Sequence, residues 1–245
     1  MEKISIRHKV AIAGKVTNAQ TNKAIALAQV RIINAPEAFV SSLVTTAKLV
    51  VSINETTEVR QARIALKNSS LSKSQKLEAA RTILDFLTAR QILTDRRTDV
   101  TLTAVDGLFY FLDLPSGEYT LMASMPHETK RYGVSPTTTV AVSDRYNSHS
   151  IADLTLPSTN LIGKITLRSE PITLAEVRVK GSQESTFSNS KGEYILSELE
   201  SSERSRTILV RARGYQAKEK IVTLSQPGEQ QTLNFELISQ SGLNS

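Results

Sequence analysis

Apolar and polar residues alternate along much of this chain. Val10, Ile12, Gly14 and Val16 alternate with polar or small residues, and residues 161–167 show the same pattern. A period of two places successive side chains on opposite faces and is typical of a half-buried β-strand. By the same criterion we expect further strands at 119–123, 138–142, 151–156, 207–212, 220–224 and 232–237.

Three sequence blocks occur twice, in the same order. Residues 12–17 match 161–166, residues 24–32 match 171–179, and residues 106–114 match 191–199. Gly107 and Gly192 lie between alternating segments, where glycine supplies the positive φ of a tight hairpin turn. The chain therefore contains one β domain twice, and many short strands separated by turns favour a sandwich.

The alternation stops between residues 35 and 97, and helical patterns replace it. Apolar residues follow Pro36 at helical spacing, a capping box is expected at Ser72–Gln75, and a short helix is expected at Val59–Leu66. The apolar stripes favour a helical hairpin that packs on itself. The alternative is a docking surface for a neighbouring subunit, whose candidate residues are Phe39, Leu43, Leu77, Leu84 and Leu87.

The repeated blocks resemble a known family. Gly-Lys-Val-Thr at 14–17, Leu-Ala-x-Val-Arg-Ile at 27–32 and Asp-Gly-x-Phe-x-Phe-x-x-Leu-Pro-x-Gly-x-Tyr-x-Leu at 106–121 are similar to the carboxypeptidase regulatory-like domain, which is a transthyretin-like (prealbumin-like) β-sandwich. The second half is similar through Gly-Glu-Tyr at 192–194 and Ala-Arg-Gly-Tyr at 212–215.

This resemblance implies a mainly β chain with two tandem antiparallel transthyretin-like β-sandwiches and an α-helical insertion in the first. The expected limits are 1–157 for the first domain, with the insertion at about 35–97, then 158–238 for the second and 239–245 for a tail.

Composition narrows the expected setting of the protein. Cysteine is absent, which excludes disulfides and thiolate chemistry and agrees with a reducing compartment. The N-terminus has no secretory signal pattern, and no apolar stretch is long enough for a membrane-spanning helix. We therefore expect a cytoplasmic protein without membrane contact. The net charge of +6 is spread over 245 residues and does not by itself indicate nucleic acid.

The sequence offers little catalytic chemistry. The three histidines, His8, His127 and His149, form no metallopeptidase motif. A transthyretin-like hydrolase, which the resemblance also raises, is associated with a Tyr-Arg-Gly-Ser ending, whereas this chain ends with residues 240–245, Gln-Ser-Gly-Leu-Asn-Ser. We therefore expect no enzyme activity, catalytic residue, cofactor, metal or small-molecule substrate, and a hydrolase is the least favoured function.

Two further side-chain arrangements could suggest a bond or a metal site. A Lys164–Asn234 isopeptide bond is disfavoured because the alternation turns Lys164 outward, away from any buried acid that could activate it. Asp106 is better explained as a hairpin turn residue than as a calcium ligand, because no dense Asp/Asn run surrounds it.

The clearest charge feature is a group of basic residues in the second half. Its candidate interaction residues are Arg204, Arg206, Arg211 and Arg213, and Arg211 and Arg213 are expected on one strand face because they are two apart. An acidic partner or nucleic acid could dock there, but the cluster has too few aromatics for base stacking, and a solvated outer face is the simplest interpretation.

These observations predict a non-enzymatic structural or adaptor protein whose partners are other protein subunits of a larger assembly. The resemblance suggests an accessory component of a phage-tail-like contractile injection system. The alternative is a carbohydrate- or peptide-binding module at the cell envelope, which the low aromatic content of 5% disfavours.

Overall fold

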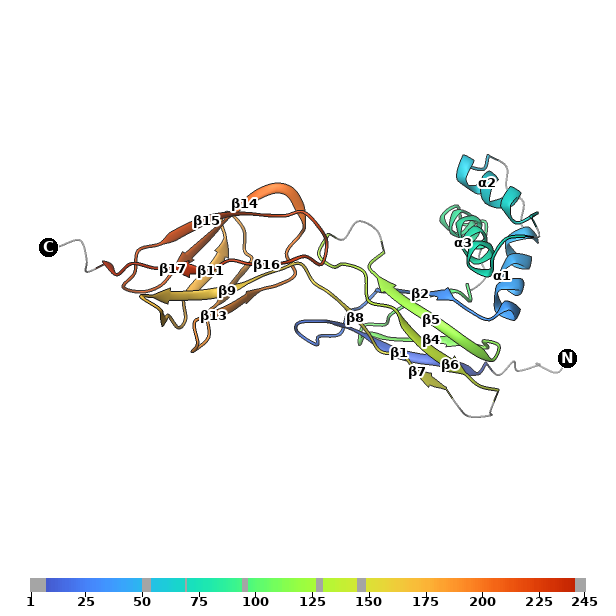
Figure 1. Cartoon of the computed structure of the whole chain (residues 1–245), viewed down its shortest axis with the longest axis horizontal. Helices are drawn as coiled ribbons and strands as arrows, with labels where there is room; N and C mark the ends of the chain where they lie inside the picture. The colour runs from blue at the N-terminus through green and yellow to red at the C-terminus, as the bar shows by residue number, and fades with distance from the viewer. Residues whose placement is uncertain are drawn as a thin grey trace. The chain divides into compact units, whose positions relative to one another are not determined.

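The computed structural model describes residues 8–49, 54–68, 70–93, 97–126, 130–144 and 149–240. The chain divides into two compact units that interleave in sequence (Figure 1). The first unit comprises Met1–Thr17, Lys23–Ala123 and Pro136–Thr155, and the second comprises Asn18–Asn22, Ser124–Ser135 and Leu156–Ser245. Two short segments that precede residue 157 therefore cluster with the C-terminal part of the chain, while the expected boundary after residue 157 stays a prediction.

The first unit contains two four-stranded sheets. One sheet has the order β4-β1-β7, with β8 also pairing with β1, and the other has the order β3-β2-β5-β6. The strands of the first sheet are β1 (Val10–Asn18), β4 (Leu108–Leu112), β7 (Ser150–Ile151) and β8 (Leu154–Leu156). Those of the second are β2 (Gln29–Asn34), β3 (Val100–Leu102), β5 (Gly117–Ser124) and β6 (Thr138–Val142). Alternate residues such as Ile12, Val30 and Leu121 are fully buried, as the period of two predicts.

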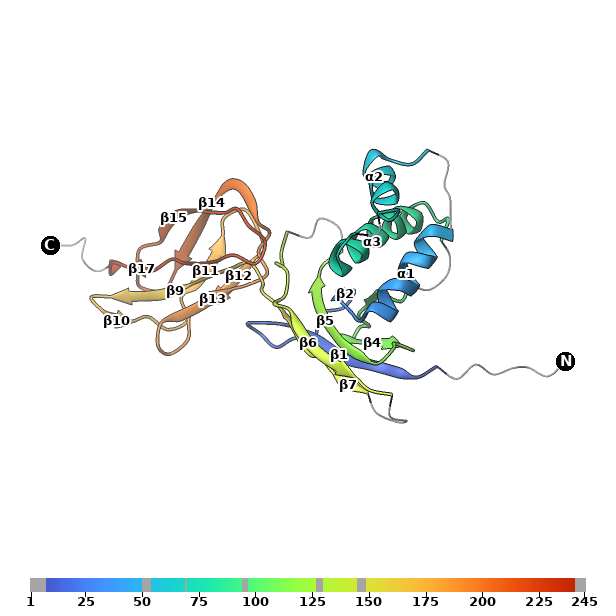
Figure 2. The same ribbon diagram turned by 45° about the vertical axis from the view of Figure 1, so that its right-hand side comes forward.

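The second unit repeats this plan (Figure 2). Its five-stranded sheet consists of β9 (Asn160–Leu167), β10 (Glu170–Pro171), β13 (Glu193–Leu196), β16 (Gln230–Thr232) and β17 (Phe235–Glu236). Its four-stranded sheet has the order β12 (Ser185–Phe187), β11 (Glu176–Val179), β14 (Ser202–Arg211), β15 (Lys218–Leu224). A core that includes Leu161, Val177 and Phe235 is buried in this unit.

Pairing is mostly antiparallel, and the exception occurs in both units. β7 runs parallel to β1, and β16 and β17 run parallel to β9. The last strand of each unit is interrupted where it crosses a glycine of the first strand. There Lys15 donates its amide to Asp153 Oδ1 at 2.9 Å, and Lys164 donates its amide to Asn234 Oδ1 at 2.8 Å.

A buried hydroxyl also recurs at matching positions. Thr103 Oγ1 donates to the carbonyl of Ile25 at 2.6 Å and accepts from the amide of Ala28 at 2.9 Å. Ser188 Oγ makes the two corresponding bonds in the second unit, at 2.7 and 2.9 Å. The predicted turn glycines, Gly107 and Gly192, have φ of 79° and 73°. These shared details confirm the mainly β fold with two tandem sandwiches.

Three helices form the insertion, as predicted: α1 (Glu37–Leu49), α2 (Thr57–Ala65) and α3 (Lys73–Ala89). The capping box at the start of α3 is present, because Ser72 accepts from the amide of Gln75 and the Gln75 side chain accepts from the amide of Ser72. α1 and α2 both pack on α3, and Phe39 of α1 stacks edge-on against Tyr119 of β5. Figures 1 and 2 show the helices gathered beside β2 and β5.

The packing of the helices places the five apolar candidates inside the unit. Side chains Phe39, Leu43, Leu77, Leu84 and Leu87 are all buried. The stripes therefore serve the self-packed helical layer, and these residues do not form a surface that a neighbouring subunit could reach.

A partly buried ionic network attaches α3 to the sandwich. Asp85 of α3 accepts from Arg31 of β2 at 3.0 Å and from Arg97 at 2.6 Å. Arg97 also donates to Asp99 at 2.7 Å, and Arg81 of α3 lies 3.7 Å from the same carboxylate. The side chain of Asp99 is fully buried, and those of Arg97 and Arg81 are nearly so. Because isolated buried charges are costly, these groups need one another.

The network predicts acid sensitivity. Burial disfavours the charged form of Asp85, but hydrogen bonds from Arg31 and Arg97 outweigh it and hold the pKa of this carboxyl below its ordinary value. A pKa that is lower in the folded state adds stability above the unfolded pKa of about 3.9, and that stability disappears as the pH falls through the folded value. We expect the unfolding free energy to fall below about pH 4 and Asp85→Asn to flatten that fall. Urea titrations across this pH range measure both, and an unchanged slope in the variant would contradict the assignment.

Candidate functional site

Most of the candidate chemistry in the sequence is not assembled into a site. His8 Nδ1 lies 2.5 Å from Asp113 Oδ2 on an exposed edge, and His127 lies outside the described residues. Asp106 accepts from the amide of Leu108 within the hairpin turn, as a turn residue should. In the described part of the chain, no group of three or more His, Cys, Asp or Glu side chains is arranged to hold a metal ion. No helix in the same part is long and apolar enough to cross a membrane.

Lys164 and Asn234 are close in space, but their contact has a structural purpose. The Asn234 side chain accepts from the backbone amide of Lys164, and the Lys164 side chain is exposed. Asp153 makes the same contact with Lys15 in the first unit. The matching pair indicates that Asn234 supports the interrupted last strand.

The four candidate arginines lie in different settings. Arg211 is exposed at the end of β14, Arg213 lies in the turn that follows, and Arg204 is exposed within the irregular part of β14. The expectation that Arg211 and Arg213 share one strand face was wrong, because the strand ends at Arg211. Arg206 differs from all three because it is only half-exposed and lines a cleft.

A local irregularity in β14 positions Arg206. Ser202 pairs with Leu224 and Arg206 pairs with Val222, so three residues of β14 oppose one residue of β15. Beyond this bulge, Arg206 lies in one row with Ile208 and Val210, both of which are fully buried. The Arg206 side chain therefore stands on the inward face of the sheet, at the end of the sandwich where the apolar core stops.

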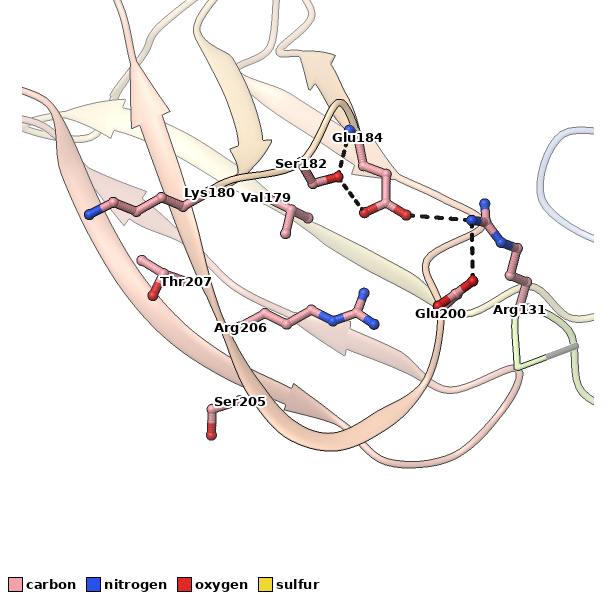
Figure 3. A pocket seen from close by; sticks show the side chains of 9 residues that line it. All are labelled: Arg131, Val179, Lys180, Ser182, Glu184, Glu200, Ser205, Arg206 and Thr207. Atoms are coloured by element: carbon pink, nitrogen blue, oxygen red, sulfur yellow. Dashed lines mark hydrogen bonds and ion pairs between the residues drawn. The ribbon is translucent and has the colours of Figure 1, made fainter. Parts of the chain in front are cut away.

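The cleft around Arg206 has a volume of about 600 Å³ and belongs to the second unit. Figure 3 shows the residues that line it: Arg131, Val179, Lys180, Ser182, Glu184, Glu200, Ser205, Arg206 and Thr207. Five of these nine side chains carry charge, and the described lining includes no histidine or cysteine. Such a lining can bind a charged group.

Both acidic side chains of the cleft already have a cationic partner. Arg131 Nη2 lies 3.5 Å from Glu200 Oε1 and 3.9 Å from Glu184 Oε1. The Ser182 hydroxyl donates to Glu184 at 2.9 Å, and Lys180 pairs with Glu219 at 2.8 Å. The acids of the cleft are therefore occupied by groups other than Arg206.

The Arg206 guanidinium is unpaired. Within the described part of the chain it makes no hydrogen bond or ion pair, and Figure 3 shows its side chain extending toward Glu200 without reaching it. A guanidinium carries five N–H donors in a planar fork that matches a carboxylate. The period-two row of Arg206, Ile208 and Val210 is the sequence signal that could have separated this arginine from its exposed neighbours.

Part of the second unit is similar to a known family. Residues 161–244 match the family model described as CarboxypepD_reg-like domain. The match covers about a third of the chain. No curated protein matches the chain.

Several solved structures are similar to this chain at low sequence identity. The Bacillus anthracis TIE protein has 9% sequence identity and a TM-score of 0.36, over 94% of this chain and 34% of that chain. The shaft pilin SpaA from Lactobacillus rhamnosus GG has 8% identity and a TM-score of 0.33, over 92% and 97%. The minor pilin GBS52 of Streptococcus agalactiae has 14% identity and a TM-score of 0.27, over 93% and 95%. This chain thus spans about a third of the Bacillus anthracis chain, and likeness at this level carries no functional argument.

Proposed function

We propose that this chain is a non-enzymatic structural or adaptor protein of a multi-subunit assembly, and that its second unit contacts a partner protein. The observation that carries the proposal is the unpaired state of four arginine guanidinium groups in the second unit. Arg204, Arg206, Arg211 and Arg213 have no partner among the described residues. In contrast, Arg31, Arg81 and Arg97 of the first unit are engaged in its internal network.

The network arginines of the first unit stabilise its fold, whereas the four arginines of the second unit make no such internal contact among the described residues. The helical insertion uses its apolar stripes and its ionic groups to pack on the first sandwich. The family whose model matches residues 161–244 is defined by its fold, and a fold of this kind does not specify a reaction. Unpaired arginines at a surface favour acidic partners and fast, salt-dependent association.

A finer placement follows the resemblance noted in the sequence. The chain is proposed to act in the cytoplasm as an accessory component of a phage-tail-like contractile injection system. The alternative is a carbohydrate- or peptide-binding module at the cell envelope, and the cleft at Arg206 is the observation that favours it. Saturable binding on a glycan array, together with elution as a single chain, would decide for the alternative.

The size of the native complex tests the assembly proposal. The protein would be tagged, released gently from its own cells and analysed by size-exclusion chromatography with mass spectrometry. We expect it to elute with other subunits in a particle much larger than the 26.9 kDa chain. Replacing all four arginines with glutamine should release it as a single chain, because the contact would lose its cationic groups.

A matched variant controls for net charge. Lys48, Arg60, Lys67 and Arg90 are exposed cations of the helical insertion. Changing these four to glutamine alters the charge by the same amount and should leave the complex intact. Elution of the unmodified protein as a single chain, or loss of the complex in both variants alike, would count against the proposal.

A further inference from the structure

We propose that the cleft around Arg206 binds a carboxylate side chain presented by an acidic segment of the partner protein. The inference rests on the proposed function for the identity of the partner as a protein, whereas the carboxylate chemistry stands on the cleft itself. Arg206 is the recognising residue. Arg131 is a positioning residue that keeps Glu184 and Glu200 engaged.

The pairing of charges in the cleft leaves one guanidinium for a single negative charge. Its lining contains three cations, Arg131, Lys180 and Arg206, and two acids, Glu184 and Glu200. Arg131 contacts both acids and Lys180 pairs with Glu219 outside the lining, so Arg206 is the cation left without a carboxylate among the described residues. One carboxylate would neutralise it. A phosphate group would bring up to two negative charges into a lining that already contains two glutamates, and the second charge adds repulsion.

The setting of Arg206 also distinguishes it from the other unpaired arginines. Exposed ion pairs contribute little, since water and salt screen them. Arg206 is half-buried beside Val179. It lies on the same face of β14 as Ile208 and Val210, which are fully buried. A carboxylate that enters this cleft can pair bidentately with the guanidinium under weaker screening. It displaces no existing partner, because Arg206 has none among the described residues.

A peptide titration tests the inference. The probe is a peptide Gly-Glu-Gly-Glu-Gly, acetylated and amidated at its ends so that only the side chains carry charge. Binding to the full chain is followed by ¹H–¹⁵N NMR at the Arg206 Nε–H group and the amides of Ser205 and Thr207. We expect saturable shifts at these positions, and no saturable shift with the matched Gly-Gln-Gly-Gln-Gly peptide.

Two variants locate the binding group. Arg206→Gln should weaken binding by about tenfold or more, because a charge-assisted hydrogen-bonded pair is lost. Arg206→Lys keeps the charge but loses the planar fork, so its affinity should fall between the two. Lys191→Gln, which removes an exposed cation of the second unit outside the cleft, should bind as the unmodified protein does. An unchanged spectrum elsewhere in each variant shows that the fold is retained.

Several results would overturn the inference: no saturable shift in the unmodified protein, equal binding by Arg206→Gln, or equal binding of the glutamine peptide. Tighter binding of inorganic phosphate would overturn the choice of carboxylate, and equally tight binding of free acetate would overturn the choice of a protein segment.

The native complex is a separate test of the proposed function. A complex that persists without peptide binding refutes the cleft inference alone, and peptide binding by a protein that elutes as a single chain refutes the adaptor function alone.

Discussion

Replacing Asp99 with asparagine is expected to lower the unfolding free energy by about 3–5 kcal/mol. The Asp99 side chain is fully buried, and it is the carboxylate that lies between the guanidinium groups of Arg97 and Arg81. Burial lowers the pKa of Arg81, with Asp99 acting in the opposite direction, whereas for Arg97 the contacts with Asp99 and Asp85 together outweigh burial and raise the pKa. Without the carboxylate, the buried guanidinium of Arg97 keeps only Asp85 and that of Arg81 keeps only Glu78 as an acidic partner. Urea denaturation of the full chain, with hydrogen exchange to localise the loss to the first unit, measures the effect.

A double-mutant cycle separates this ionic origin from a general packing defect. Two nitrogens of Arg81, Nε and Nη2, are buried without a hydrogen-bond partner among the described residues. Arg81→Met should therefore cost much less than Asp99→Asn and should recover part of the loss when combined with it. Glu219→Gln breaks an exposed pair with Lys180 and serves as the control, with an expected change below about 1 kcal/mol. An Asp99→Asn variant as stable as this control would contradict the account.

Elements defined by local pattern could be predicted from the sequence. The strands follow the period of two, and the turns at Gly107 and Gly192 follow from glycine's freedom at positive φ. The capping box at Ser72 depends on residues three apart, so the sequence alone specifies it. Each of these features needs only near neighbours along the chain, and the repeat supported each strand assignment a second time.

Features that depend on contacts between distant residues could not be predicted. Arg31 meets Asp85 across 54 positions, and no pattern along the chain marks that pair. Burial of the helical stripes followed from how α1 and α2 pack on α3, which periodicity leaves open. Grouping the four arginines by their closeness in sequence also joined residues that lie in different settings along β14 and in the turn after it. The bulge before Arg206 turns that residue inward, and the end of β14 leaves Arg213 in a turn.

The repeat contains information that sequence matching alone did not use. Thr103 and Ser188 occupy matching places and bond the same backbone groups, although they lie outside the aligned blocks. Asp153 and Asn234 likewise perform the same contact with different chemical groups. A hydrogen-bonding role that is kept without residue identity is invisible to residue matching, and only the structure shows that the two members of each pair occupy matching places in the two units.

The glycine beneath the interrupted last strand should not tolerate any side chain. A Cβ atom at Gly163 would lie 2.2 Å from the carbonyl oxygen of Leu233 and 2.9 Å from the Tyr194 ring. The nearer contact is backbone, held in place by the bond from the Leu233 amide to the carbonyl of Ile162 at 2.8 Å. We expect Gly163→Ala to cost about 3 kcal/mol, at the upper end for overpacked sites, and Gly163→Val to prevent folding of the second unit. Urea denaturation measures the first, and loss of the unit's NMR dispersion reports the second.

Two other glycines test whether the stability loss in Gly163→Ala comes from the close approach of the backbone. Gly14 occupies the matching place in the first unit, where a Cβ would lie 2.0 Å from the carbonyl oxygen of Ala152. Gly14→Ala should therefore cause a similar loss that hydrogen exchange assigns to the first unit. Gly181 has φ of 81° but no atom within 4 Å of its would-be Cβ. Gly181→Ala should thus cost only the backbone strain of about 1–2 kcal/mol. If Gly163→Ala proved no more costly than Gly181→Ala, the interrupted strand would not need its glycine.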